Sequence, residues 1–285
     1  MAFPRGRIYA NALRTELRVG GRVDLLTVAK EFHLSIREAD LSGCDGALLR
    51  SSKDSSGIIV VKSSIREIGR KRFTVAHEIG HRLLHGVSAA CTSSDIGNWS
   101  ITAQAQEREA DEFAAELLIP YKECSAFIRG RSPSIQTIES VAEEFDVSLS
   151  ASAWRYCDVV DLPCAMVWST DEVIKWSHKS DSFQFFLQRG VKVPQGSYAM
   201  AAYKGNKLAE HPESISAVEW IDGGRLLDGA EIWEQSLSLP SYNSVITLLW
   251  VKGKITKDEV EEDTLLEELD PEEFTLRRKR WPGKR

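Results

Sequence analysis

The fold of this chain is decided by Arg72-Phe73-Thr74-Val75-Ala76-His77-Glu78-Ile79-Gly80-His81, which contains the pattern H-E-x-x-H. On a helix, His77 and His81 lie one turn apart on the same face, so both imidazole rings can reach one ion. Two imidazoles leave a zinc ion room for a third protein ligand and a water molecule. Glu78 stands next to the first ligand, where a carboxylate can take a proton from that water. The stretch therefore predicts a helix that carries a zinc site, and a chance occurrence of the pattern is the alternative.

The residues around the motif predict where its helix begins and ends. Ser64 and Glu67 have the spacing of a capping box, which opens a helix. Gly86 has the position of a glycine that ends one. Between these limits, the apolar row with helical period consists of Val75, Ile79 and Leu83.

The segments before this helix are shorter and less regular. Residues 8–20 and 22–34 show helical spacing and are expected to pack over the motif helix. Residues 40–56 are small and polar, which favours loops or a weak hairpin. Residues 57–62 form a β-branched run of strand length. This run is either a core strand or an edge strand beside the cleft, with which an extended peptide could pair.

The third ligand is expected on a second helix, predicted over residues 102–119. At about 100° per residue, Glu107 lies on the same side as the apolar positions of this helix. Glu109 lies with Glu112 and Glu116 on the face that we expect to be solvated. Helix geometry therefore selects Glu107 as the ligand and makes Glu109 a surface charge.

Other polar residues near the motif have expected roles as well. Asp111, one turn beyond Glu107, is placed to accept the free N–H of a ligating histidine and so fix its tautomer, unless it is a solvated carboxylate. His85 is rotated about 80° from His77 around the helix, so we expect it at the helix end or on the surface rather than on the metal. The donor that stabilises the oxyanion is not identified by any pattern, and His85 and Tyr121 are the candidates.

The two segments together resemble the core of the ImmA/IrrE family of metallo-endopeptidases. The resemblance rests on the motif with the following Leu84-His85-Gly86 and on the segment from Glu107 to Pro120, and it covers about residues 20–157. Members often carry Asn where Asp111 stands and Met where Ile119 stands, and neither difference disturbs the ligand set. The resemblance implies a zinc-dependent protease that acts on helix-turn-helix repressors and so switches on stress, phage or mobile-element genes.

Composition restricts the class of protein. The chain has 285 residues, 42% hydrophobic and 27% charged, as is ordinary for a soluble globular protein. No apolar run is long enough to span a bilayer, and the basic N-terminus is not followed by the apolar segment of a signal peptide. Five scattered cysteines without a C-x-x-C pair indicate reduced thiols, so we expect a cytoplasmic protein. The net charge of −6 argues against general affinity for nucleic acid.

Residues 136–156 are predicted to form a helix, a short turn and a second helix, with Ser148 as the cap of the second. The spacing resembles a helix-turn-helix. Its charge does not, because Arg155 is the single basic residue among four acidic ones, whereas a recognition helix carries basic or amide side chains toward DNA. We therefore interpret this pair as structural packing.

The composition changes after residue 159, since six of the eight tryptophans lie beyond residue 160. A mostly antiparallel sheet is expected, beginning with a hairpin over residues 165–176. The tryptophans are expected to pack in the core rather than to form a binding cage. Thr256 and Glu259 have the spacing of a capping box that opens a charged C-terminal helix. The other expected elements are strands at 198–203, 217–221, 232–237 and 245–251 and a short helix at 183–188.

These observations combine into one hypothesis. The fold is α+β, with a helical zinc-metalloprotease domain and small sheet at 1–132, a helix-turn-helix-like pair at 133–158 and a C-terminal α/β domain, sensory or regulatory, at 159–285. One zinc ion is held by His77, His81 and Glu107, with Asp111 behind them and Glu78 as the catalytic base. The expected substrate is a helix-turn-helix repressor; neither membrane association nor direct DNA binding is expected. The alternative is a zinc-containing regulatory protein that sequesters or displaces the repressor without cleaving it.

Overall fold

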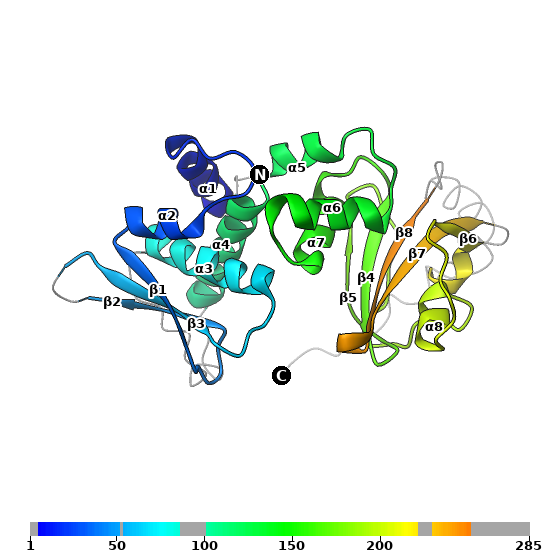
Figure 1. Ribbon diagram of the computed structural model, residues 1–285. Coiled ribbons are helices and arrows are strands. Elements are labelled where there is room, and N and C mark those ends of the chain that lie inside the picture. The colour runs from blue at the N-terminus through cyan, green and yellow to red at the C-terminus, as the bar shows by residue number, and fades with distance from the viewer. Residues whose placement is uncertain (1–4, 52–53, 86–100, 222–229, 252–285) are drawn as a thin grey trace, which may run out of the picture.

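Two long helices, α3 (Ile68–Leu84) and α4 (Ile101–Leu118), pack against each other at the centre of the N-terminal half. The computed structural model describes residues 5–51, 54–85, 101–221 and 230–251, and it has the expected α+β fold (Figure 1). A small sheet covers one side of the helix pair and α1 lies on another side (Figure 1). The other elements of this half are α1 (Arg5–Glu16), α2 (Leu25–Glu31), β1 (Leu34–Ala39), β2 (Gly46–Arg50), β3 (Gly57–Lys62), α5 (Tyr121–Ile128), α6 (Ile135–Phe145) and α7 (Leu149–Val159).

The small sheet has the strand order β1-β3-β2, with β1 parallel and β2 antiparallel to β3. Ile59 and Val61 of β3 point into the core, which is the alternation expected of a strand with one buried face. Because β3 lies in the middle, the core-strand prediction for residues 57–62 is confirmed and the edge-strand alternative is wrong. The edges are β1, which pattern analysis missed, and β2, which lies within residues 40–56 but pairs with β3 instead of forming a hairpin inside that segment.

The start of α3 differs from the prediction. The helix begins at Ile68, with Glu67 at the cap position and no side-chain cap, so the capping box at Ser64 and Glu67 is wrong. Tertiary packing places this end instead, because the turn between α6 and α7 lies directly against Gly69. A Cβ atom at Gly69 would stand 2.2 Å from the backbone nitrogen of Ser148. The other predicted boundary, Gly86, lies outside the described residues.

The helical pair α6–α7 forms as predicted. Asp146 ends α6 in the left-handed conformation, and the Ser148 hydroxyl accepts a hydrogen bond from the Ala151 N–H at the start of α7. Arg155 on α7 is 5% exposed and pairs with Glu116 and Asp158. The one basic side chain of the pair therefore points into the protein.

The second sheet has the strand order β5-β4-β8-β7-β6, and every pairing is antiparallel, as expected. Alternate residues of β4 and β8 face opposite sides, and both sides are covered. Met166 and Leu248 join the core that continues through α6 and α7, whereas Val167 and Leu249 face α8 and its flanking loops. The elements of this half are β4 (Cys164–Thr170), β5 (Val173–Lys179), α8 (Tyr198–Tyr203), β6 (Glu213–Ser216), η2 (Ala217–Glu219), β7 (Glu231–Leu239), η4 (Pro240–Tyr242) and β8 (Ser244–Trp250).

Three predictions for this half are wrong. Residues 198–203 form the helix α8, capped by the Ser197 hydroxyl, and not a strand. Residues 217–221 contain the short 3-10 helix η2 instead of a strand, and residues 183–188 contain no helix. Short apolar runs do not distinguish a buried helix from a buried strand, which is the reason for these errors. The predicted charged helix beginning at Thr256 lies outside the described residues.

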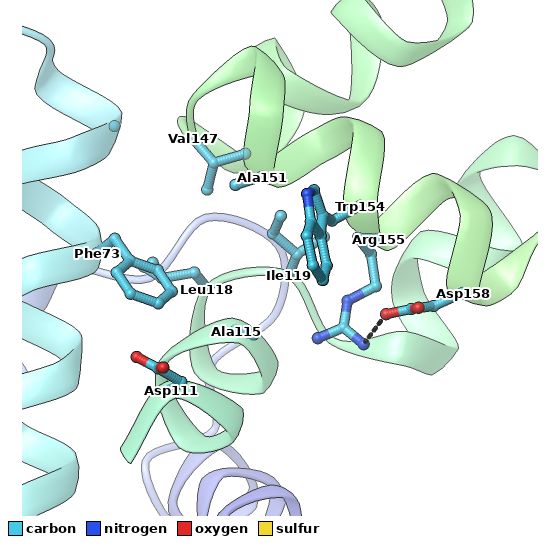
Figure 2. A pocket seen from close by; sticks show the side chains of 11 residues that line it. Phe73, Asp111, Ala115, Leu118, Ile119, Val147, Ala151, Trp154, Arg155 and Asp158 are labelled. Carbon is cyan, nitrogen blue, oxygen red and sulfur yellow. Dashed lines mark ion pairs between the residues drawn. The ribbon is translucent and has the colours of Figure 1, made fainter. Parts of the chain in front are cut away.

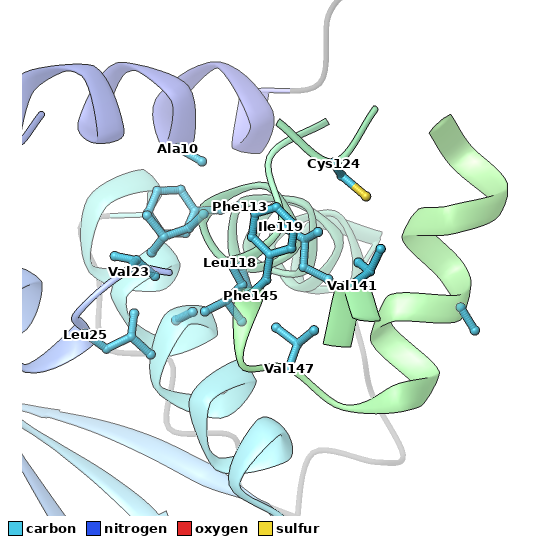
Figure 3. Packing of buried hydrophobic residues seen from close by; sticks show 14 of the residues in the cluster. Ala10, Val23, Leu25, Phe113, Leu118, Ile119, Cys124, Val141, Phe145 and Val147 are labelled. Atoms are coloured by element: carbon cyan, nitrogen blue, oxygen red, sulfur yellow. The ribbon is translucent and has the colours of Figure 1, made fainter. Parts of the chain in front are cut away.

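The main hydrophobic core is continuous from α1 to one face of the second sheet. Near the helix pair, Phe113 and Leu118 of α4 pack with Phe145 of α6 (Figure 3). The same cluster includes Cys164 and Ile246 of the second sheet. The hydrophobic core therefore crosses both domain boundaries proposed from the sequence, at residues 132 and 158. These boundaries stay predictions. Within the described ranges, no helix is both long and apolar enough to cross a membrane.

Candidate metal centre

The predicted ligands come together between α3 and α4. The Nε2 atoms of His77 and His81 lie 2.9 Å apart. The carboxylate of Glu107 approaches both, with distances of 3.2 Å to His77 Nε2 and 3.3 Å to His81 Nε2. Among the described residues, this set is the group of His, Cys, Asp and Glu side chains able to hold a metal ion, with its ligand atoms all within 4.8 Å of one another.

The electrostatics of Glu107 also fit a metal ligand. Burial raises the pKa of this carboxyl, but the adjacent imidazoles of His77 and His81 outweigh burial and hold the pKa well below its usual value. The ionised carboxylate is the form that binds a metal. Two nitrogens and one carboxylate oxygen are a donor set that zinc accepts, and three protein ligands leave one position for a reacting group.

Glu78 lies beside this set and is 2% exposed. Within the described part of the chain, its Oε2 atom has no hydrogen-bond partner. Burial raises the pKa of Glu78, while His77 and His81 lower it. Buried carboxylate oxygens nearly always have a partner, so an unpartnered one next to a metal-binding set fits a base that acts on a bound water.

The edge strand β2 reaches the same place. A Cβ atom at Gly46, the first residue of β2, would stand 2.3 Å from Thr74 Cγ2 and 3.1 Å from Glu78 Oε1. Glycine therefore allows the backbone of β2 to lie directly on α3 beside Glu78. The strand that borders the site is thus β2 and not β3.

Asp111 occupies its predicted position. Its Oδ1 atom lies 2.9 Å from His77 Nδ1, the ring nitrogen that faces away from Glu107. A carboxylate there accepts the Nδ1–H, which leaves Nε2 unprotonated toward the metal position. The arrangement fits the expected role of fixing the tautomer of His77.

His81 is supported by a longer chain that the sequence reading missed. Its Nδ1 lies 3.0 Å from His85 Nδ1, and His85 Nε2 lies 3.1 Å from Glu109 Oε2. The hydrogen-bond acceptors fix where the protons lie. Glu109 accepts from His85 Nε2–H, and a neutral imidazole carries a single N–H. The Nδ1 of His85 is therefore unprotonated and accepts from His81 Nδ1–H. Burial lowers the pKa of His85, which favours this neutral ring. The signal in the sequence is the spacing of His85 one turn after His81.

His85 lies at the helix end as expected, as the C-cap residue of α3. Its side chain is nevertheless only 3% exposed, and Glu109, expected in solvent, contacts it, so the solvated role of Glu109 is wrong. Glu116, expected on the solvated face, is 2% exposed and contacts Arg7 and Arg155. The cause is α1, which packs along α4 and supplies arginines to its acids.

Neither candidate for the oxyanion donor faces the metal position. His85 is occupied behind His81. Tyr121 lies beyond the far end of α4, where the Arg7 guanidinium stacks on its ring at 5.3 Å. From Glu107 to the end of α4 at Leu118, the helix rises about 16 Å.

Comparisons with known proteins bear on the family and on the fold. Residues 29–155 match the family model described as an IrrE N-terminal-like domain. A Mycobacterium tuberculosis transcriptional regulator of known structure has a TM-score of 0.55 at 15% sequence identity, over 86% of this chain and 75% of that chain. At this identity the likeness concerns the fold alone. No curated protein matches the chain.

Proposed function

Residues 29–155 of this chain belong to the ImmA/IrrE family of metallopeptidases, and from this premise we propose that the chain is a zinc-dependent endopeptidase that cleaves a helix-turn-helix repressor. The observation that carries the proposal is the unpartnered oxygen of Glu78, buried beside His77, His81 and Glu107. A structural zinc site has four protein ligands and needs no base. The three-ligand set with a buried carboxylate favours an enzyme over a protein that only sequesters the repressor.

The residues divide the chemistry between them. His77, His81 and Glu107 would hold the ion, and zinc when bound supplies the Lewis acidity that makes water a nucleophile at neutral pH. Glu78 takes the proton from the attacking water. It then delivers this proton to the amine that leaves when the C–N bond of the peptide breaks. Its raised pKa suits both steps, because a base that must return its proton works best with a pKa nearer the working pH.

The edge strand β2 supports a polypeptide substrate. It borders the small sheet with one side unpaired by any described strand, and its first residue lies against Glu78. An extended segment of a substrate can add to such an edge through backbone hydrogen bonds. A peptide carbonyl would then be presented to the metal position independently of the side chains on either side.

The repressor as substrate rests on the family, and two observations are consistent with it. The chain itself is poorly suited to DNA, since its net charge is −6 and Arg155 of the helix-turn-helix-like pair is buried in ion pairs. The structurally similar mycobacterial protein is described as a transcriptional regulator. Both observations are consistent with a regulatory effect exerted through a protein partner.

The proposal is tested by incubating the zinc-loaded protein with a helix-turn-helix repressor encoded next to it and identifying products by mass spectrometry. Wild type is expected to cut the repressor at a defined bond. Glu78→Gln should retain one zinc ion per chain and lose cleavage, because the amide cannot take a proton from water. Glu112→Gln, on the exposed surface of α4, is the matched control and should cleave normally. Loss of zinc in Glu78→Gln would make Glu78 a ligand and contradict the mechanism.

A further inference from the structure

Two cavities meet along α7, one beside the metal centre and one at the second sheet. The near cavity, about 320 Å³, lies between α3, α4 and α7 (Figure 2). The far cavity, about 630 Å³, extends from α7 to the second sheet. Phe73, Ala151 and Trp154 line both. We call the combined surface the α7 trough, with these three residues at its centre, Asp111 at the near end and Trp176 and Tyr242 at the far end.

The near end of the trough is continuous with the metal centre. Phe73 precedes His77 by one turn of α3, and their ring centroids are 6.4 Å apart. Asp111 lines the near cavity with the same carboxylate that contacts His77. A residue next to the bond at the metal position would therefore direct its side chain toward this cavity.

The lining of the near cavity selects for apolar groups, whereas the far cavity also carries Glu67 and Arg70. Besides Asp111 at its end, the charges in the near cavity are Arg155 and Asp158, which pair with each other (Figure 2). A charged side chain inside would lose water without gaining a partner. The volume of the near cavity is at the lower end of the roughly 300–1,000 Å³ of ligand pockets, which suits a side chain rather than a folded element.

The aromatic residues of the trough are held in place although they are exposed. Trp154 is 43% exposed, yet its ring stacks on His178 at 4.1 Å and lies 5.8 Å from Trp176. His178 is fixed in turn by Asp158, at 2.7 Å. Tyr242 at the far end is 59% exposed. Rigid, accessible aromatic side chains are what recognition surfaces use, because little side-chain entropy is lost on binding.

We propose that the α7 trough binds a segment of the protein substrate carrying large apolar side chains, with one in the near cavity and another against the tryptophans of the second sheet. The inference rests on the proposed peptidase function and deepens it. Trp154 and Ala151 are then specificity-determining residues, and the second sheet takes part in choosing the bond that is cut. The tryptophans of the second sheet were expected to pack in the core rather than to form a binding cage. In this proposal, those that line the trough also form part of a binding surface.

The test compares three variants on a library of peptides. Trp154→Ala removes the shared wall, and Ala151→Phe fills the trough while leaving the stacking of Trp154 intact. Wild type is expected to cut next to Leu, Ile, Met or Phe. Both variants should lose this preference, with kcat/KM for the preferred peptides falling about tenfold or more, because burial of one large apolar side chain is lost. Phe186→Ala, which removes a 76% exposed aromatic outside the trough, is the control and should behave as wild type.

Binding separates this inference from the proposed function. In a Glu78→Gln background, the tryptophan fluorescence should report binding of the same apolar peptides, and adding Ala151→Phe should abolish that signal. Zinc content and melting temperature identify a variant that has misfolded. If Glu78→Gln bound the peptides but wild type did not cleave them, the proposed peptidase function would be wrong and the proposed binding role of the trough would stand. Cleavage with an unchanged preference in a folded Ala151→Phe variant, or unchanged peptide binding, would overturn the trough.

Discussion

The two histidines of the metal centre are supported by different groups. His77 donates directly to the Asp111 carboxylate, whereas His81 donates to the neutral ring of His85, which passes the contact on to Glu109. A carboxylate makes its histidine a stronger ligand than a neutral imidazole does. His81 is fully buried. Helix α4 carries both the proposed ligand Glu107 and Glu109, which orients the proposed ligand His81 through His85.

This arrangement predicts that removing the support of His81 weakens zinc binding. His85→Ala should lower zinc affinity about 10–100-fold, the range for groups that orient a metal ligand, and Glu109→Gln should lower it less. Competition with a coloured chelator measures both. Glu112→Gln, three residues after Glu109 on α4 and exposed, is the control. Unchanged affinity in His85→Ala would show that packing alone orients His81.

At the scale of elements, close backbone contact sets the position of α3. Gly46 brings the edge strand β2 onto its middle, and Gly69 brings the α6–α7 turn onto its first turn. The first contact places an edge strand beside Glu78. The second places α7 where it can form the trough with Phe73. Both contacts involve residues distant in the chain, and neither leaves room for a side chain.

Gly69→Ala is therefore expected to destabilise the protein although alanine favours helices. Helix propensity alone would stabilise by about 1 kcal/mol. The added methyl would stand 2.2 Å from Ser148 N and 2.6 Å from the carbonyl carbon of Val147, so overpacking of about 1–3 kcal/mol should exceed that gain. Urea unfolding measures the difference. Gly20→Ala, with no atom within 4 Å of the new methyl, is the control. A more stable Gly69→Ala would mean that the turn moves away without cost.

On the scale of the whole molecule, the second sheet completes the core of the first half. Met166, Ile246 and Leu248 belong to the cluster that runs back through α6 and α7 to α1. The proposed metal ligands lie on α3 and α4, which share this core. The second sheet therefore contributes to stability but supplies no proposed ligand for metal binding.

Removing the second sheet should separate these two properties. A chain that ends at residue 160 loses the cover of α6 and α7, so its melting temperature should fall by several degrees or more, since each large apolar side chain uncovered costs about 1.5–3 kcal/mol. Zinc should still raise that temperature, because a ligand that binds only the folded state stabilises it. Calorimetry with and without zinc measures both effects. A truncated chain that melts like the intact protein would show that the two halves are independent.

Local spacing in the sequence determined the motif helix, the choice of Glu107 and Asp111 on α4, the existence of strand β3 and the helical pair α6–α7. Each follows from residues a few positions apart, and the catalytic and ligand roles assigned to them stay predictions. Tertiary structure alone decided what covers each face. A period of 3.6 shows that Glu109 and Glu116 share a face, but only tertiary packing, with α1 against α4, makes Glu116 buried there. His85 likewise became a support for His81 because α4 brings Glu109 to it from 24 residues away. A local pattern cannot show contacts of this kind, because it does not reveal which distant residues the folded chain brings together.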